Sequence, residues 1–172
     1  RVESLESRQL MSGDLGAVSG LAAPALVVRP TAAPAAGSAS FVGTDATTQG
    51  NWTSAYGADG YEVLGGQTSL PSYATVAPSG AATYAWAPTT SDARALLQGP
   101  SSTTSQRVAA CWYSSGGFGL DARIGDGATH QVSLYALDWD YSLGGRSERV
   151  DVIDDATGAV LDSRTLSSFG GG

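Results

Sequence analysis

The sequence predicts an all-β fold: an antiparallel β-sandwich, jelly-roll-like, with one short helix and an irregular N-terminal extension. Short β-prone runs recur along the chain from residue 40 onward, and clusters of turn-forming residues separate them. Charged residues make up only 15% of the 172 residues, while 23 residues are Gly. Many short strands at regular spacing, joined by such turns, are typical of β-sandwiches.

The first part of the chain differs in composition from the rest. Residues 1–10 are charged, and residues 13–37 are rich in Ala, Pro and Gly without a sustained period. We therefore expect residues 1–38 to be an export-associated segment and linker, followed by a β-sandwich module over residues 39–172. The β-prone run Ala25–Val28 is an exception within the linker, and we expect it to pair as a strand with its own domain or with a neighbour.

Strand candidates follow one another through the module, and turn residues separate them. The turns Gly57–Gly60 and Gly125–Gly127 combine Gly, which accepts positive φ, with Asp, which bonds to nearby backbone. The run Ala93–Leu97 predicts the short helix, with Ser91 or Asp92 as its cap. The expected strands cover residues 40–45, 61–64, 73–76, 82–87, 107–113, 118–124, 130–139, 149–154 and 159–167.

The charge balance limits the partners of the module. All nine basic residues are arginines, sixteen residues are acidic, and the net charge is −7. Nucleic-acid binding needs clustered basic residues, and anionic lipid surfaces also attract basic segments. The sequence has no run of about 20 apolar residues, the length that a membrane-spanning helix requires. We therefore expect no nucleic-acid partner and no membrane insertion.

Signatures of catalysis are missing from the sequence, which indicates a protein that is not an enzyme. His130 is the only histidine, and no Gly-x-Ser-x-Gly elbow accompanies it, so a Ser-His-Asp site is not expected. Cys111 is the only cysteine; it lies in an apolar run and is expected to be a buried, inert thiol. No cofactor is expected, apart from the structural calcium ion considered next.

Acidic residues in the last third of the chain are candidate ligands. Asp138 and Asp140 lie two residues apart, on the same face at the end of an expected strand, and the pair Asp154–Asp155 lies in a turn. Such carboxylates form ion pairs with Arg146 or Arg149, hold a structural calcium ion, bond a ligand, or act as an acid-base pair on a glycoside. The sequence leaves these four interpretations open, and the metal ligands stay unknown.

Aromatic residues provide the candidate binding surface. Trp and Tyr rings stack on the apolar faces of sugars, while neighbouring polar side chains bond the sugar hydroxyls. The alternative is that the same rings cover the ends of the sandwich or its other sheet. Trp86 and Trp112 lie within apolar strands and are expected in the core. The candidate ligand-binding residues are Trp52, Tyr56, Tyr61, Asp138, Trp139, Asp140 and Tyr141.

Two stretches resemble known families. The residues Leu5-Glu6-Ser7-Arg8, followed by Leu10 and Met11, resemble the LEPR-XLL segment near the N-terminus of large exported and cell-surface bacterial proteins. Residues 40–169 resemble a carbohydrate-binding-like (galactose-binding-like) sandwich module of bacterial extracellular proteins. These resemblances imply an extracellular or cell-surface location. The second rests on the motifs Thr48–Trp52, Tyr56–Tyr61, Ala110–Tyr113 and Leu137–Asp140.

The module that the chain resembles implies an open sheet edge. Modules of that kind carry about two more strands after the hairpin expected at residues 149–166, so the sandwich here is expected to lack its last strands and to add a strand at that edge. The strand would come from the Ala25–Val28 run or from a neighbour.

Two hypotheses about function follow. The first is a non-catalytic extracellular module that binds a polysaccharide or a surface glycan through exposed aromatic rings. The alternative is a structural surface or fibre subunit whose partners are other copies of the same protein, assembled by β-strand exchange between chains. Glycan binding requires exposed rings, whereas strand exchange requires an unpaired sheet edge.

Overall fold

The computed structural model describes residues 37–140 and 145–172, and all of them belong to one unit of the chain, Ala36–Gly172. The Ala25–Val28 run and the Leu5–Met11 segment lie outside the described residues. Among the described residues, no helix is long and apolar enough to cross a membrane.

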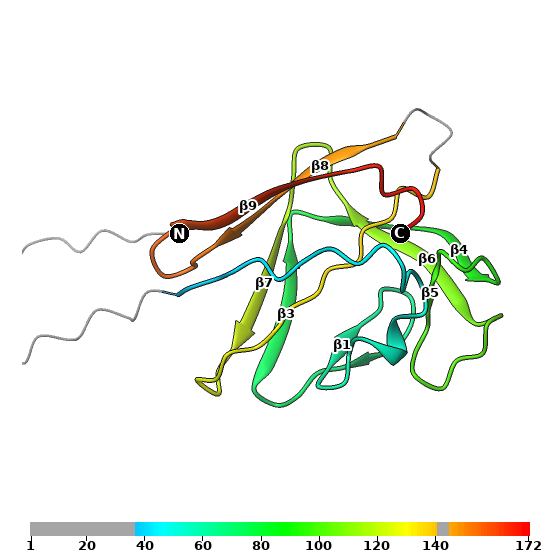
Figure 1. Cartoon of the computed structure of the whole chain (residues 1–172), viewed down its shortest axis with the longest axis horizontal. Coiled ribbons are helices and arrows are strands. Elements are labelled where there is room, and N and C mark those ends of the chain that lie inside the picture. Colours follow the sequence, from blue (N-terminus) through cyan, green and yellow to red (C-terminus); the bar gives the residue numbers. More distant parts are fainter. Residues whose placement is uncertain (1–36, 141–144) are drawn as a thin grey trace, which may run out of the picture. The chain divides into compact units, whose positions relative to one another are not determined.

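The described chain is almost entirely β, so the predicted all-β class is confirmed (Figure 1). Its one helical element is a single 3₁₀ turn, η1. The elements are η1 (Trp52–Ser54), β1 (Tyr61–Glu62), β2 (Thr68–Ser69), β3 (Ala74–Ser79), β4 (Ala82–Thr90), β5 (Leu96–Leu97), β6 (Arg107–Tyr113), β7 (Gly119–Ile124), β8 (Ser147–Ile153) and β9 (Val160–Ser167).

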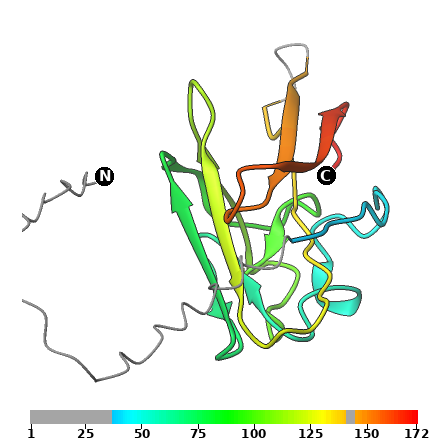
Figure 2. The same cartoon turned by 90° about the vertical axis from the view of Figure 1, so that its left-hand side faces the viewer.

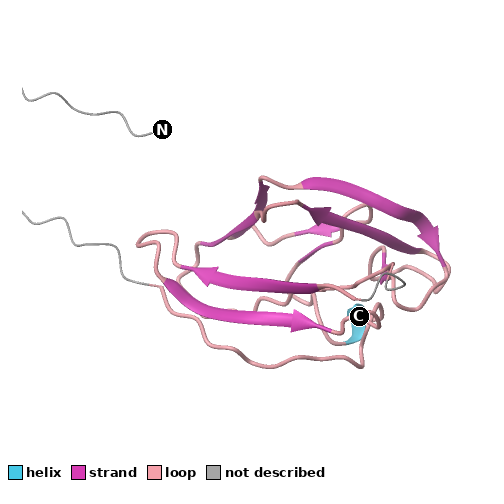
Figure 3. Cartoon of the chain, turned by 90° about the horizontal axis from the view of Figure 1, so that it is seen from above, coloured by secondary structure: helices cyan, strands magenta, loops and turns pink. Residues whose placement is uncertain are grey.

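The strands form four small antiparallel sheets in place of two large ones. The sheets are the pairs β1–β2, β3–β7 and β8–β9 and the three-stranded sheet with the order β4-β6-β5. Strand β6 is central in its sheet, as expected for its continuous apolar run, and the sequence predicted its bounds correctly. Figures 2 and 3 show the β8–β9 hairpin as a group of its own, apart from β4 and β6.

Strands β3 and β4 are nearly continuous but turn a corner between them. Only two residues separate the strands, and Gly80 has φ +72°, a conformation that L side chains rarely adopt. The partner strands β6 and β7 change direction in the same way, but a longer loop joins them. This follows because β3 pairs with β7 and β4 pairs with β6. Figure 1 shows that the two pairs run in different directions. Strands that bend in this way pass from one sheet to another.

A small hydrophobic core lies between η1, β5 and β6. Trp52, Val63, Leu97 and Val108 are buried together. The indole Nε1 of Trp52 donates a hydrogen bond to the carbonyl oxygen of Leu97 at 2.8 Å, so the polar edge of this ring is satisfied inside the core. The half-buried residues Tyr56, Tyr61, Leu96 and Ala110 pack around this cluster.

The buried guanidinium of Arg107 ties two loops to β6. Arg107 is only 2% exposed, and its Nη1 donates to the carbonyl oxygens of Ala95 at 2.9 Å and Ala93 at 3.4 Å. Its Nη2 donates to the side-chain oxygen of Asn51. Gly50 must be glycine here, because a Cβ at this position would lie 2.0 Å from the carbonyl oxygen of Ala95. One cation therefore fixes residues 50–51 against residues 93–95.

The predicted helix over Ala93–Leu97 is wrong. The residues form a turn and then β5, which pairs with β6. The backbone N–H of Arg94 donates to the carboxylate of Asp92 at 3.0 Å, so the expected cap chemistry is present without a helix after it. Pairing with β6 and the hydrogen bonds from Arg107 outweigh the local helix preference of this run.

Other elements were placed only in part by the sequence. Residues 40–45 and 130–139 were expected as strands but form no ladder, and the two-residue strands β2 and β5 were not expected. Trp86 and Trp112 are half-buried and do not belong to the core cluster, which corrects their expected place. The core instead lies around Trp52 of η1, whose indole N–H donates to the carbonyl oxygen of Leu97 in β5.

Replacing Gly57 by Ala should destabilise the module more than the same change at Gly80. Both residues have positive φ, at 74° and 72°, and share the cost of about 1–2 kcal/mol for a Cβ in that conformation. At Gly57 the new Cβ would also lie 2.5 Å from the Trp52 ring, whereas at Gly80 nothing lies within 4 Å. We expect the Gly57→Ala variant to unfold at lower urea concentration than Gly80→Ala. Equal midpoints would show that the Trp52 ring is not held against this turn.

Replacing Arg107 by Met should lower the free energy of unfolding by about 3 kcal/mol, because three acceptors lose a charged donor inside the protein. The matched control is Arg123→Met, whose side chain is 71% exposed and pairs with Asp121 at the surface, with an expected change below about 1 kcal/mol. Urea denaturation followed by Trp fluorescence measures both. An Arg107→Met variant as stable as the control would contradict the anchoring role.

Candidate functional site

The first predicted group of binding residues belongs largely to the core. Trp52 is 7% exposed, and its ring lies against Tyr61 with 4.8 Å between centroids. Gly57 covers the Trp52 ring, since a Cβ there would collide with it. Burial on these sides leaves the Trp52 ring no free face on which a sugar can stack.

Tyr56 is held by an acidic loop beside the core. Its hydroxyl donates to the carboxylate of Asp45 at 2.9 Å. Asp45 also accepts hydrogen bonds from the side chains and backbone N–H groups of Thr47 and Thr48. These donors stabilise the ionised carboxylate and hold the pKa of Asp45 well below its usual range, while the bond to Asp45 raises the pKa of Tyr56. The Tyr56 hydroxyl is therefore already engaged within the module.

Asp138 and Asp140 share one arginine. Asp138 is 2% exposed and accepts hydrogen bonds from the backbone N–H of Arg146, at 2.8 Å, and from its guanidinium. The same guanidinium bonds to Asp140, whose pKa it lowers. The backbone N–H of Asp138 donates to the carbonyl oxygen of Phe169 at 3.1 Å. Of the four interpretations of these acids, the structure shows the ion pair with Arg146. This ion pair and the bond to Phe169 tie the 131–140 segment to the residues just before β8 and just after β9.

The second predicted acidic pair lies in the β8–β9 turn. Asp154 is 9% exposed and accepts hydrogen bonds from the backbone N–H of Ala156, the hydroxyl of Thr157 and the backbone N–H of Gly37. These bonds close the turn and lower the pKa of Asp154, with the Thr157 hydroxyl the strongest cause. Asp155 stays exposed in the same turn. The turn thus explains Asp154 without a ligand.

Trp139 is half-buried, and the guanidinium of Arg94 lies over its ring. The guanidinium carbon of Arg94 lies 4.8 Å from the centroid of the Trp139 ring, a cation–π arrangement. Asp92 holds this guanidinium at 2.8 Å and raises the pKa of Arg94. One face of Trp139 is therefore occupied by Arg94. Tyr141, the last of the predicted binding residues, lies outside the described residues.

The predicted residues therefore form two groups on different elements. Trp52 and Tyr61 are in direct contact on η1 and β1, and Arg146 joins Asp138 to Asp140 at the end of the 131–140 segment. Each group is bonded within the module. Their contacts serve the fold. The sequence offered the Arg146 ion pair only as one of four interpretations, and it did not predict the bond from Trp52 to the distant Leu97.

Two exposed tyrosines that the sequence interpretation did not select lie on one face of β4 and β6. Tyr84 is 53% exposed and Tyr113 is 49% exposed. Tyr84 pairs with Cys111 across the strands and Tyr113 pairs with Ala82, so the two rings are diagonal neighbours. The Trp86 ring meets the Tyr84 ring edge-on at 5.2 Å. The alternation of aromatic residues in Tyr84-Ala85-Trp86 was the available signal for this surface.

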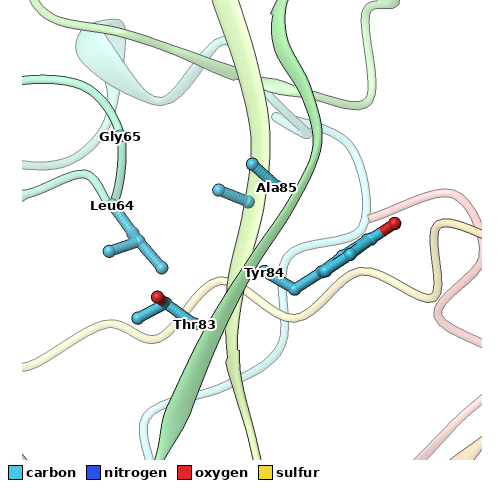
Figure 4. A pocket seen from close by; sticks show the side chains of 6 residues that line it. Leu64, Gly65, Thr83, Tyr84 and Ala85 are labelled. Carbon is cyan, nitrogen blue, oxygen red and sulfur yellow. The ribbon is translucent and has the colours of Figure 1, made fainter.

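A small open hollow of about 180 Å³ lies on the other face of β4. Figure 4 shows Leu64 and Thr83 on one side of the strand and the Tyr84 ring on the other. Apart from the hydroxyl groups of Thr83 and Tyr84, its lining side chains are apolar or small, and no acidic, basic or thiol side chain lines it. It carries no catalytic arrangement.

The described residues 37–140 and 145–172 include one histidine, His130, and one cysteine, Cys111. No three His, Cys, Asp or Glu residues of this part of the chain come together as metal ligands. His130 bonds to Asp126 at 2.9 Å and lies beside the Tyr73 ring. Cys111 is half-buried, and burial raises its pKa, which favours the neutral thiol. A structural calcium ion stays a prediction.

Comparisons with protein-family profiles, with curated proteins and with solved structures find no match to this chain.

Proposed function

We propose that this chain is a non-catalytic structural module that acts outside the cell or at the cell surface by assembling with further copies of itself through β-strand pairing. The observation that carries the proposal is an excess of exposed apolar side chains. Among the described residues, six hydrophobic residues are buried, whereas twelve large hydrophobic residues are exposed. Where such residues adjoin one another on one face, they mark an interaction site.

The exposed apolar residues belong in part to amphipathic ribbons. On β3 and β7, cross-strand pairing places Ala74, Val76 and Pro78 on one face with Leu120, Ala122 and Ile124, while Thr75, Asp121 and Arg123 share the other face. Ile124 on the apolar face is 38% exposed. At the turn end of the β8–β9 hairpin, the paired residues Ile153 and Val160 are 56% and 58% exposed.

The sheets also have unpaired edges. Within the part of the chain that the structure describes, β3–β7 and β8–β9 are two-stranded, so each strand has one neighbour. An isolated two-stranded hairpin is marginally stable in water, and three or more strands with an apolar face are needed for independent stability. Strand addition supplies both the missing backbone hydrogen bonds and apolar cover.

We also propose that the module is an open β-sandwich, in which the β8–β9 hairpin belongs to one layer and the β4-β6-β5 sheet to the other. Cys111 on β6 lies within electrostatic reach of Arg146 and Glu148 at the start of the hairpin. Tyr84 and Tyr113 share the Cys111 face and stay about half exposed, at 53% and 49%, which supports an interlayer space that is not filled. The extracellular location rests on the resemblance of Leu5–Met11 to the LEPR-XLL segment.

Self-assembly is tested with the full chain by sedimentation velocity from low to high micromolar concentration. We expect the average mass to rise with concentration, and an Ile153→Glu variant to shift this rise to higher concentration, because a charge replaces an exposed apolar contact. Thr104→Glu, in an exposed loop, is the control and should behave as the parent chain. A mass equal to one chain at every concentration would refute the assembly proposal.

A second candidate function is glycan binding, and the exposed pair Tyr84 and Tyr113 favours it. Two neighbouring tyrosine rings on a sheet face offer the flat apolar surface on which sugar rings stack. Trp86 steadies the Tyr84 ring by its edge-on contact. This platform replaces the predicted one around Trp52, whose ring is buried.

Glycan binding is tested by affinity electrophoresis of the full chain in gels that contain soluble polysaccharides. We expect retardation that a Tyr84→Ala/Tyr113→Ala double variant loses, while Tyr73→Phe keeps it, because Tyr73 lies beside His130 before β3. Retardation that survives the double variant would place binding elsewhere. Absence of retardation by every polysaccharide would remove this candidate.

A further inference from the structure

We propose that β9 is the strand that pairs between copies, antiparallel to β9 of a second copy and centred on Ser163. This inference rests on the proposed assembly and adds the edge, the partner strand and the register. A pairing of this kind has two-fold symmetry, so each copy offers the same surface.

Among the described residues, the outer edge of β9 has no backbone partner. Within residues 37–140 and 145–172, β8 is its one strand neighbour, and no backbone hydrogen bond outside the β8–β9 ladder reaches residues 160–167. In the described part of the chain, a ring contact on this strand comes from Phe41, whose ring centroid lies 4.3 Å from the guanidinium carbon of Arg164. Phe41 is 49% exposed, and this contact is with the Arg164 side chain and not with the β9 backbone.

The sequence of β9 is self-complementary about Ser163. Antiparallel pairing centred there places Asp162 opposite Arg164 of the second copy, and Arg164 opposite Asp162 of the second copy. It also places Val160 opposite Leu166. Opposite charges and apolar pairs directly across an antiparallel ladder are stabilising, whereas like charges are destabilising.

Within one copy, the ion pair between Asp162 and Arg164 shows that the two side chains share a face. Their closest atoms are 2.9 Å apart. Val160 is 58% exposed, and Leu161 forms an irregularity where the β8–β9 register shifts. In the pair of copies, the two charges of each strand would bond across the ladder as well as along it, forming a four-membered network.

Charge also favours β9 over the neighbouring edge. The chain has a net charge of −7, so two copies repel each other at a distance. Strand β9 is locally neutral, with one Asp and one Arg, whereas β8 carries Glu148 and Asp151 against the single Arg149. A neutral strand with alternating charges adds no repulsion of its own.

Strand β7 has the same Asp-x-Arg spacing but is a weaker candidate. It is six residues long, against eight for β9. Its Arg123 bonds to Asp121 and also lies 4.0 Å from Asp155 in the β8–β9 turn, so this cation is shared with another element. The experiments below separate the two strands.

The charge pattern is tested by a swap in the full chain. The variants Asp162→Arg and Arg164→Asp each place like charges opposite each other in a symmetric pair, so each should associate with itself about tenfold more weakly than the parent. An equal mixture of the two variants restores Arg opposite Asp at both positions, and association should recover. The corresponding pair on β7, Asp121→Arg and Arg123→Asp, should leave association unchanged.

The register is tested by cross-linking. In a chain with Cys111→Ala, a Ser163→Cys substitution puts the two new thiols directly opposite each other, within disulfide distance. Thr165→Cys, on the same face of β9, is the matched control, because its copies would be several residues apart along the ladder. We expect disulfide-linked dimers for Ser163→Cys and not for Thr165→Cys under mild oxidation.

The outcomes separate this inference from the proposed function. If the parent chain associates but the mixed charge variants do not recover and Ser163→Cys does not cross-link, the β9 pairing is refuted and assembly through another surface stands. If the β7 variants abolish association, the pairing strand is β7. If the parent chain stays a single copy throughout, both the assembly proposal and the β9 pairing are refuted.

Discussion

The guanidinium of Arg107 is buried at the start of β6, and the loops that contain residues 50–51 and 93–95 are bonded to it. Burying a cation is costly unless its donors are bonded. Here the carbonyl oxygens of residues 93 and 95 accept from Nη1 and the side chain of Asn51 accepts from Nη2, while the buried Nε has no partner among the described residues. Those acceptors belong to loops that have little apolar surface of their own. Because the loops converge on one cation, β5 lies beside β6 and Trp52 reaches the carbonyl of Leu97.

The rest of the module lacks a comparable centre. Strands β3 and β7 and the β8–β9 hairpin are held by their own ladders and by surface ion pairs such as Asp162 with Arg164. Exposed ion pairs contribute little to stability, and two-stranded sheets are marginal alone. Polar contacts link the hairpin to the rest, among them the bonds of Asp138 to Arg146 and to the Phe169 carbonyl. We therefore expect a partner strand to stabilise this half more than the half around the core.

The sequence predicted the features that depend on local pattern. The apolar run of β6 and the turn residues around the β8–β9 hairpin placed those strands closely, because period and turn chemistry are local. The helix at Ala93–Leu97 was wrong since its competitor, pairing with β6, is not local. Trp52 was a plausible sugar platform in the sequence, but a bond to a residue 45 positions away buries it. The Arg146 ion pair was one of several open interpretations, and only the fold selects it.

If copies pair through β9, the half of the module around β5 and β6 is stable by itself, and the β8–β9 half gains stability from its partner. Hydrogen–deuterium exchange of the full chain at low and high protein concentration measures this directly. We expect the amides of β5 and β6 to be protected equally at both concentrations, while amides of β9 gain protection at the higher one. Protection of β9 that is strong and independent of concentration would contradict the account, because the hairpin would then be stable without a partner.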